Sequence, residues 1–474
     1  MYYVYIRYFS SLAGIPGPAR AYLSRLWLVY HSRQGDMHRV LPKLHTKYGK
    51  IVRIAPNELA VADLEAIREI YGPGSKYRKS DWYSVWQGTQ KTDLFAERSI
   101  PVHAALKRNI SRAFSMSSLT KLEQGVDGVI ALFIARMHEQ GSQVVDLGYW
   151  LQLLAFDVIG EVAFSRRFGF VDAGKDDGTL GRIELALKSL ASVGQMPWVF
   201  WVDYYLAPII GPKLNLALRH GTIRAYASNA VKARRARFSS AACAEDILGQ
   251  LFKVQEAKPQ SLDDDAIASI ATATVFAGSD TTAISLRAII YFLIKNPRCL
   301  THLRKEMEER KRSGLLRFPA TFSQVSDWPY LQAVISESLR LHPAVGLTLP
   351  RVVPEGGTTI NGHSIPAGTT VGVNAWVVHH DPTVFGRDHE DFRPERWLEE
   401  GKGNMERYFF AFGGGQRLCI GKNISLMEMS KAIPLFFDTF DVTLVDANKP
   451  LHENCQWFVK QEGLLVRLLP RNKP

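Results

Sequence analysis

Helical periodicity dominates the chain between about residue 63 and about residue 350. In the most informative segment, Ser261 to Pro297, about thirty consecutive residues without proline are apolar almost all round. Acidic residues follow Ser261, which predicts a capping box between Ser261 and Asp264, and Asn296–Pro297 predicts the end of the helix. A helix that is apolar on every side belongs in the centre of a large domain. We therefore expect one long central helix here.

Two segments outside the helical stretches have the residue pattern of β-hairpins. Lys47 to Asp63 predicts a short hairpin that turns at Pro56–Asn57. After Pro343, the stretch "TTINGHSIPAGTTVGVNAWVVHH" is rich in β-branched residues, and its Asn361–Gly362 pair is a strong signal for a two-residue turn. This second segment predicts a small antiparallel sheet, after which a loop punctuated by prolines leads back to helix.

The chain has no internal repeat, no low-complexity region and no convincing domain boundary. We expect a mainly α fold with small antiparallel β-sheets, in a single domain over residues 19–474. Residues 1–18, "MYYVYIRYFSSLAGIPGP", are an apolar segment and a Pro/Gly hinge, interrupted by Arg7. The segment is shorter than the roughly 20 apolar residues of a spanning helix, and it lacks the features of a secretory signal. We expect it to lie near a membrane without a full spanning helix.

Composition narrows the function classes only slightly. The 474 residues are 46% hydrophobic and 22% charged, which is typical of a globular protein with room for an internal ligand. The net charge of +12 is dispersed, apart from a cluster at residues 231–237. A solvated basic surface explains it most simply, and an acidic partner protein or an anionic membrane comes next. No nucleic-acid-binding motif accompanies the charge, so we expect no nucleic-acid partner.

The four cysteines point to one position. Cys243, Cys299, Cys419 and Cys455 are far apart, without the spacing of a zinc site or a disulfide framework, which favours a reducing compartment. Cys419 lies in "FAFGGGQRLCIGKNIS", between a glycine-rich loop and the expected start of a helix. A helix N-terminus and a nearby arginine lower the pKa of a thiol. The local chemistry fits a metal ligand, a nucleophile or a buried filler, and by itself does not separate them.

The wider pattern around this cysteine is more specific. Phe412, Gly415, Arg417, Cys419 and Gly421 form the motif F-x-x-G-x-R-x-C-x-G. With three further motifs in matching order, the chain resembles the cytochrome P-450 heme-thiolate monooxygenases over nearly its whole length, and most of all the filamentous-fungal microsomal members. The resemblance implies heme b between the long central helix and the cysteine loop, with the Cys419 thiolate as the axial iron ligand. It places the other four residues at the cofactor.

The central helix contains "AGSDTT", Ala277 to Thr282. A glycine inside a helix costs about 1 kcal/mol relative to alanine, and Ser and Thr hydroxyls bend helices by bonding to carbonyl groups. A close helix–helix crossing would explain these residues structurally. The resemblance implies instead a local opening of the helix over the heme at Ala277 and Gly278. Thr281 would then donate a hydrogen bond to dioxygen at the heme, and Asp280 would help to deliver protons.

Two further motifs concern arginines and the cysteine loop. Glu337 and Arg340, in "ESLR", share one helix face, which by itself fits an ordinary surface ion pair. The resemblance implies that Arg396, in "FRPERW", joins them as a buried triad that supports the cysteine loop. A departure from the family pattern is Pro434, which should kink or end the helix that follows Cys419.

The two heme propionates need cationic or strongly donating partners. The positions that match the family are Arg417, Arg351, His103 and Lys107. Lysine offers a point charge where the family commonly has the bidentate guanidinium of arginine. Each of the four could also be an ordinary surface cation.

The resemblance implies a monooxygenase that uses O2 as co-substrate. Electrons would come from NADPH through a separate cytochrome P-450 reductase, with cytochrome b5 as a second donor, because the chain has no flavin- or nicotinamide-binding motif. Lys422 is a basic residue that could dock this partner. We expect a monomer at the cytosolic face of the endoplasmic reticulum membrane. Desaturation, ring-forming oxidation or rearrangement remain alternatives, as does, more remotely, a non-enzymatic heme sensor.

The expected substrate is a lipophilic small molecule of secondary metabolism, such as a terpenoid, polyketide or alkaloid intermediate. This follows from the apolar and aromatic character of the expected pocket walls, although core packing would explain the same residues. The expected walls are Ser80–Gly88, Met196–Pro208, Ala273, Phe276, Ala277 and Ala344–Leu349. The Met196–Pro208 segment could instead lie at a membrane interface.

Overall fold

The computed structural model describes residues 9–88, 90, 92–210, 228–229, 231–236 and 245–471. Residues 1–8 of the expected N-terminal segment 1–18 lie outside this part of the chain, as do Cys243 and the last residue of the basic cluster at 231–237.

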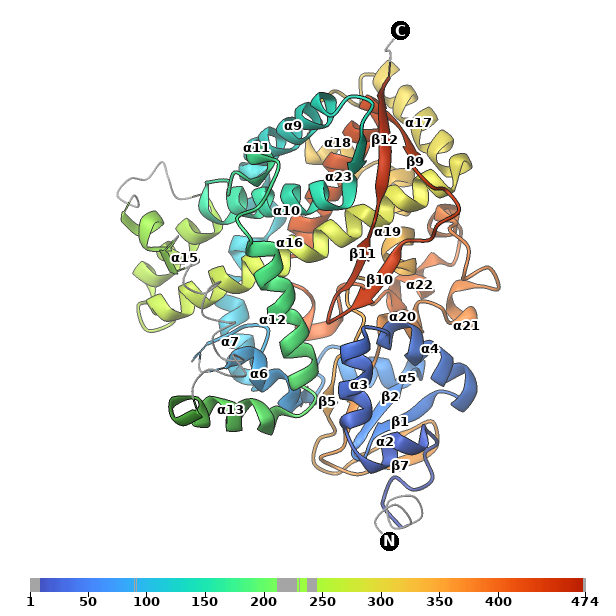
Figure 1. The fold of residues 1–474 in the computed structure, drawn as a ribbon. Helices are drawn as coiled ribbons and strands as arrows, with labels where there is room; N and C mark the ends of the chain where they lie inside the picture. The colour runs from blue at the N-terminus through green and yellow to red at the C-terminus, as the bar shows by residue number, and fades with distance from the viewer. Residues whose placement is uncertain are drawn as a thin grey trace.

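Helices make up most of the structure, and a long helix, α16, crosses its centre (Figure 1). The longer helices are α3 (Leu26–Gln34), α4 (Met37–Tyr48), α5 (Leu64–Tyr71), α7 (Ile100–Ile110), α9 (Glu123–Glu139), α10 (Leu147–Phe164), α12 (Thr179–Val193), α13 (Pro197–Ile210), α15 (Ile247–Ala257), α16 (Asp264–Lys295), α17 (Pro297–Arg312), α19 (Pro329–Leu341) and α23 (Lys422–Thr439). The short helices are α2 (Ala19–Leu23), α6 (Ser84–Gln87), α8 (Met116–Leu119), α11 (Phe170–Ala173), α18 (Phe322–Ser326), α20 (Ala375–Val378), α21 (Pro382–Phe385) and α22 (Lys402–Tyr408).

Helix α16 confirms the predicted central helix but not its predicted cap. The helix runs over 32 residues and ends before Pro297, as expected. Its N-cap is Asp263, whose side chain accepts a hydrogen bond from the backbone N–H of Ala266 at 2.7 Å. The Ser261 hydroxyl instead donates to the Lys258 carbonyl. The predicted Ser261–Asp264 capping box is therefore wrong, because Asp263, directly before the first helical residue, caps the helix instead of Ser261.

The strands form one larger sheet and three small ones. The larger sheet has the order β1-β2-β8-β5-β3, and its β1–β2 hairpin turns at Pro56–Asn57 as predicted. Strands β2 and β8 pair in parallel, so this sheet is mixed rather than purely antiparallel. The pairing joins segments about 310 residues apart, a contact that local sequence patterns do not encode. The strands are β1 (Ile51–Ala55), β2 (Glu58–Val61), β3 (Arg78–Lys79), β4 (Val144–Asp146), β5 (Arg351–Val352), β6 (Thr358–Ile360), β7 (His363–Ile365), β8 (Thr370–Gly372), β9 (Phe440–Leu444), β10 (His452–Cys455), β11 (Val459–Glu462) and β12 (Leu465–Pro470).

The predicted hairpin turn at Asn361–Gly362 is present between β6 and β7. Both residues have positive φ angles, +47° and +77°, which is the backbone of a type I′ turn. The sequence pattern was sufficient here because the turn geometry depends only on these two residues.

Helix α10 packs along α16 in the core (Figure 1). Within the described residues it is the one helix long and apolar enough to cross a membrane, and 83% of that stretch is buried inside the protein. Its apolar character is therefore explained by its place in the core.

Helix α23 follows the cysteine loop and runs without a break through Pro434 to Thr439. Of the two expectations for Pro434, that it kinks or that it ends this helix, the second is wrong. Pro434 and its neighbours Ile433 and Phe436 are buried, so tertiary packing holds the helical backbone despite the hydrogen bond that proline cannot make.

Candidate active site

The loop before Cys419 is tight and depends on glycine. The Cys419 backbone N–H donates to the Phe412 carbonyl at 3.0 Å, which closes the loop. Gly413 and Gly415 have φ angles of +72° and +54°. A Cβ atom on Gly415 would lie 2.0 Å from the Tyr71 carbonyl oxygen, so no other residue fits there without a shift of the backbone. The glycine part of the loop therefore packs against the end of α5, which fixes the loop that carries Cys419.

Cys419 itself is accessible, and helix α23 begins three residues later. Lys107 holds the loop from outside, because its ammonium donates to the Gln416 and Leu418 carbonyls at 2.9 and 3.0 Å. Desolvation raises the pKa of the Cys419 thiol, and the backbone N–H groups of Gly421 and Lys422 offset this only in part. The expected net lowering by the helix and Arg417 is thus wrong for the protein groups alone. A coordinated metal ion deprotonates a thiol whatever its intrinsic pKa.

Helix α16 exposes a short stripe on one side. Ala277 is exposed and Thr281, one turn later, is partly exposed, whereas Ser279, Asp280 and most of the helix are buried. The expected opening of the helix at this point is not present, because α16 is helical throughout. The Thr281 hydroxyl donates to the Ala277 carbonyl at 2.7 Å, which satisfies the group within the continuous helix.

Gly278 faces helix α10 and not the accessible stripe. A Cβ atom on Gly278 would lie 2.9 Å from Cδ1 of Ile159. The expectation that Gly278 lies at the cofactor is therefore not supported by this geometry. The close crossing of α10 and α16 explains the glycine, which was the structural alternative for this motif.

Asp280 points in a different direction from Thr281, because adjacent helical residues are about 100° apart. Its carboxylate accepts a hydrogen bond from the Gln152 side chain, and the carbonyl oxygen of that side chain accepts one from Arg287 at 2.9 Å. Burial raises the pKa of Asp280, and the positive charges of Lys460 and Arg287 offset part of this rise. Asp280 is thus a buried acid held by α10.

Five basic side chains gather near the cysteine loop. They are Lys79, His103, Lys107, Arg351 and Arg417. Lys79 was not among the residues expected from the sequence. It lies on β3 directly across from Arg351 on β5, and both side chains are buried. Like charges directly opposite each other in a sheet are destabilising.

Within the described part of the chain, none of these five side chains forms an ion pair with a carboxylate. Arg417 donates to the Glu97 carbonyl at 2.7 Å, and Arg351 to the Tyr83 hydroxyl and the Pro350 carbonyl, both at 3.0 Å. Lys79 donates to the Phe95 carbonyl.

The charges in this cluster act on one another. Burial first, and then the neighbouring cations, lower the pKa of His103 to about 3 and that of Arg417 to about 10. Burial and the same neighbours lower the pKa of Lys79, with partial compensation from Asp93 and Glu97. The protein therefore concentrates positive charge that a dianionic group would neutralise.

Glu337, Arg340 and Arg396 meet in the interior behind the loop. Arg340 binds both oxygens of Glu337 at 2.8 and 2.9 Å, and Arg396 donates to Glu337 Oε1 at 2.9 Å. All three are at most 1% exposed. The Trp397 indole donates to Glu337 Oε2 at 2.8 Å, a contact that the sequence did not suggest. The carboxylate is thus fully used by charge-assisted hydrogen bonds.

His379 connects this triad to the cysteine loop and was also missed from the sequence. Its Nδ1–H donates to the Arg340 carbonyl at 2.9 Å, and its Nε2 accepts from the Phe410 backbone N–H at 2.7 Å. Burial lowers the pKa of His379 to about 3, which keeps the ring neutral with one donor and one acceptor. A histidine without a motif around it gives no signal of such a role in the sequence.

A heme, the group that the sequence resemblance implies, fits the residues present. Cys419 offers an accessible sulfur, the cation cluster would bind its two propionates, and the stripe of Ala277 and Thr281 leaves room on α16. Among the described residues no three His, Cys, Asp or Glu side chains gather as a metal site. Cys419 would therefore be the protein ligand to the iron of a bound heme, and the iron would supply the chemistry of O2 activation.

The amino-acid sequence is similar to those of known monooxygenases. The cytochrome P-450 family pattern matches residues 15–467. The chain is 39% identical to the cytochrome P-450 monooxygenase hepC of Aspergillus oryzae over 456 residues, 92% of this chain and 88% of the relative. It is 36% identical to a pisatin demethylase of Fusarium vanettenii over 469 residues, 98% and 90% of the two chains.

A third relative, the cytochrome P-450 monooxygenase gsfF of Penicillium aethiopicum, is 36% identical over 482 residues, 99% of this chain and 96% of the relative. Membership in the family implies a heme cofactor, O2 as co-substrate and electrons from a reductase. The chain therefore belongs to the cytochrome P-450 family and is an oxygen-incorporating oxidoreductase.

Proposed function

We propose that residues 19–474 form one catalytic domain that inserts one oxygen atom of O2 into a lipophilic small molecule, with heme b bound through the Cys419 thiolate. The observation that carries this proposal is the accessible Cys419 sulfur beside Lys79, Lys107, Arg351 and Arg417, which have no carboxylate ion-pair partner among the described residues. A heme would provide an iron ion for the Cys419 sulfur and two negatively charged propionates for the cations. When bound, the heme supplies the iron chemistry of O2 reduction and oxygen transfer.

The residues of the chain would divide the remaining work. Lys79, His103, Arg351 and Arg417 would hold the propionates, and Lys107 would hold the cysteine loop through its two carbonyl contacts. Thr281 would offer its hydroxyl on the accessible stripe of α16, after release from the Ala277 carbonyl. Asp280 would supply protons from the other side of the helix. Glu337, Arg340 and Arg396 would support the loop structurally.

The substrate would lie against an aromatic wall that continues from α16. The ring of Phe276, next to Ala277, lies 6.3 Å from that of Trp86, and Trp86 lies 5.8 Å from Trp457. Phe95 completes this group at 5.9 Å from Trp457. Such a wall favours flat or bulky apolar molecules through area burial and ring contacts. We include a terpenoid, polyketide or alkaloid intermediate of secondary metabolism in this class.

Helix α13 supports a membrane contact better than a pocket wall. Trp198 and Tyr205 are 64% and 70% exposed, while Phe200 and Asp203 are buried. Large exposed apolar residues also occur on α2 and α3, which lie with α13 on the lower side of the molecule in Figure 1. The exposed apolar residues on the three helices include Trp198, Val202, Tyr205, Leu206 and Ile209 on α13, Leu23 on α2, and Leu26 and Tyr30 on α3. Aromatic residues of this kind prefer the membrane–water interface, here that of the endoplasmic reticulum.

The redox partner would be an NADPH-cytochrome P-450 reductase, with cytochrome b5 as a second donor. Arg108 and Arg112 are exposed near the cysteine side of the molecule, and Lys422 is partly exposed at the start of α23. These cations suit an acidic partner surface. We expect the enzyme to act as a monomer.

The proposal is tested with purified enzyme, reductase, NADPH and ¹⁸O2 against a panel of methoxylated aromatic and terpenoid probes. The expected result is a product, or formaldehyde after demethylation, that carries one ¹⁸O atom and depends on NADPH. Dehydrogenated or ring-closed products without ¹⁸O would favour the alternative oxidations. Heme binding without any NADPH-dependent product or O2 consumption would contradict the enzymatic proposal.

A further inference from the structure

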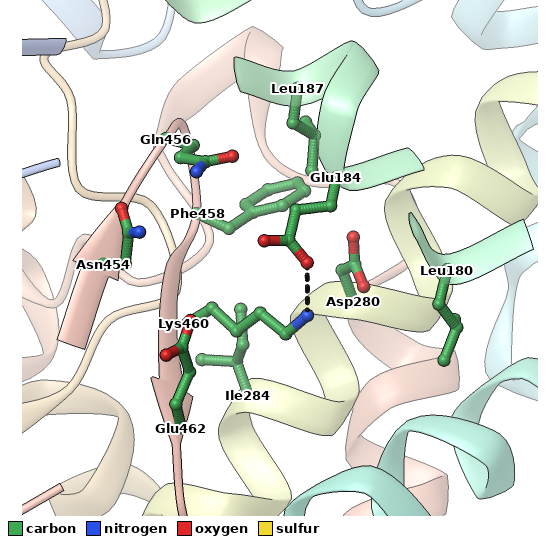
Figure 2. Close-up of a pocket in the computed structure, with 10 residues that line it drawn as sticks. All are labelled: Leu180, Glu184, Leu187, Asp280, Ile284, Asn454, Gln456, Phe458, Lys460 and Glu462. Atoms are coloured by element: carbon green, nitrogen blue, oxygen red, sulfur yellow. Dashed lines mark hydrogen bonds and ion pairs between the residues drawn. The ribbon is translucent and has the colours of Figure 1, made fainter. Parts of the chain in front are cut away.

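A small polar pocket lies between α12, α16 and the β10–β11 hairpin (Figure 2). Its volume is about 30 Å³. The residues around it are Leu180, Glu184, Leu187, Asp280, Ile284, Asn454, Gln456, Phe458, Lys460 and Glu462. Six of these ten side chains are charged or carry an amide.

Asp280 forms the inner end of this pocket. Its side chain is 9% exposed, and Gln152, itself held by Arg287, fixes its Oδ1 from the α10 side. Within the described residues that is the one hydrogen bond of the carboxylate. Gln152 therefore fixes the Asp280 carboxylate on the side of α10, and the pocket lies on its other side.

An ion pair forms the outer end. Lys460 Nζ on β11 lies 3.0 Å from Glu184 Oε2 on α12, and the two side chains are 33% and 44% exposed. Figure 2 shows this pair beside Asp280, with Leu180 and Leu187 next to it on α12. The charges of this pair act on Asp280 together with that of Arg287: the positive charge of Lys460 lowers its pKa and the negative charge of Glu184 raises it, against a larger rise due to burial. Glu462 on β11 is a further acid in the pocket lining.

The pocket suits water and not substrate. A site of this volume holds about two water molecules, and its polar lining offers the partners that buried water needs. A lipophilic substrate would not fit in a space of about 30 Å³. Because Asp280 and Thr281 face different directions on α16, water here stays separate from the accessible stripe at Ala277 and Thr281.

We propose that this pocket is the route by which protons reach Asp280 from solvent, with Glu184 as the solvent-side carboxylate and Lys460 as the residue that positions it. The inference rests on the proposed function, in which Asp280 supplies protons. Insertion of one oxygen atom reduces the other to water, which takes two electrons from the reductase and two protons from solvent. Each water in the pocket accepts one proton from outside and releases one inward, so it is unchanged after each transfer.

The test follows the Asp280 carboxyl in the heme-loaded enzyme by infrared difference spectroscopy. Subtraction of the Asp280→Asn spectrum identifies its band, and its titration gives the midpoint. Lys460→Met is expected to raise that midpoint and Glu184→Gln to lower it, each by about one pH unit, a tenfold change in proton affinity. Leu187→Phe, which fills the pocket, is expected to slow hydrogen–deuterium exchange of the band at least fivefold. The opposite shifts of the midpoint would show that both charges act on Asp280, and the slower exchange would show that its protons pass through the pocket.

Lys121→Met is the matched control, because Lys121 pairs with Glu245 at 3.0 Å on an exposed surface outside the pocket residues. It should leave both midpoint and exchange unchanged. The inference is overturned if Lys460→Met and Glu184→Gln also leave both unchanged. The carbon monoxide spectrum of each variant separates this failure from failure of the proposed function: a normal thiolate spectrum with an unmoved Asp280 band counts against the pocket alone.

Discussion

The hydroxyl groups of Thr282 on α16 and Ser425 on α23 lie 2.8 Å apart, in hydrogen-bond distance across two core helices. Thr282 follows Thr281, and Ser425 lies six positions after Cys419. The bond therefore fixes the helix with the accessible stripe to the helix that starts at the cysteine loop.

Loss of this bond should lower stability modestly. A buried hydrogen bond contributes about 1 kcal/mol, so Thr282→Val and Ser425→Ala should each lower the free energy of unfolding by about 1 kcal/mol. The double variant should lose less than the sum, since each single variant already breaks the same bond. Urea unfolding of the four proteins measures the coupling. Strictly additive losses would show that the two hydroxyls do not interact in solution.

Substitution of Glu337 should lower the free energy of unfolding much more than loss of the Thr282–Ser425 hydrogen bond. Glu337→Gln leaves buried Arg340 without its carboxylate partner and leaves Arg396 with Asp388 alone, at 3.2 Å, which we expect to cost about 3–5 kcal/mol of unfolding free energy. Glu139→Gln provides the comparison, because Glu139 pairs with Arg136 on an exposed helix face and should change stability by less than about 1 kcal/mol. Urea unfolding compares the two. Equal small effects would remove the structural role assigned to the triad.

His379 should make the fold sensitive to acid. Its pKa in the folded protein is about 3, below the ordinary value of 6.5, so the unfolded chain binds the proton first as pH falls. Its stabilising contribution is complete above about pH 6.5 and is lost towards pH 3, at up to about 1.4 kcal/mol per pH unit. The slope of unfolding free energy against pH should therefore be smaller in His379→Gln than in the wild type. Identical slopes in this window would contradict a neutral, buried His379.

The cation cluster should control heme retention. Lys79→Met removes a buried charge near the expected propionates, and a charge-assisted hydrogen bond is worth about 1.5–3 kcal/mol, so heme loss should be about tenfold faster or more. Arg78→Met is the matched control, because Arg78 is the neighbouring residue of β3 and is exposed. Transfer of heme to apomyoglobin measures both rates. Equal rates for the two variants would exclude Lys79 from the heme site.

Local motifs predicted more of this site than of its surroundings. The cysteine loop follows from residues 412–421 alone, because glycine geometry and a helix start are properties of adjacent residues. The pairing of Lys79 with Arg351 depends on strand register across about 270 residues, which no local pattern encodes. Pro434 shows the reverse case, since packing of α23 in the core overrides a strong local signal. The pocket at Asp280 needs three separate elements and so became visible only in the folded chain.

The central claim is that Cys419 ligates the heme iron. It is tested most directly by the spectrum of the reduced enzyme with carbon monoxide, for the wild type, Cys419→Ser and the control Cys299→Ala, which removes a buried cysteine outside the cysteine loop. The account predicts the red-shifted Soret band of thiolate ligation in the wild type and in Cys299→Ala, and its loss in Cys419→Ser. A thiolate spectrum that persists in Cys419→Ser would contradict it.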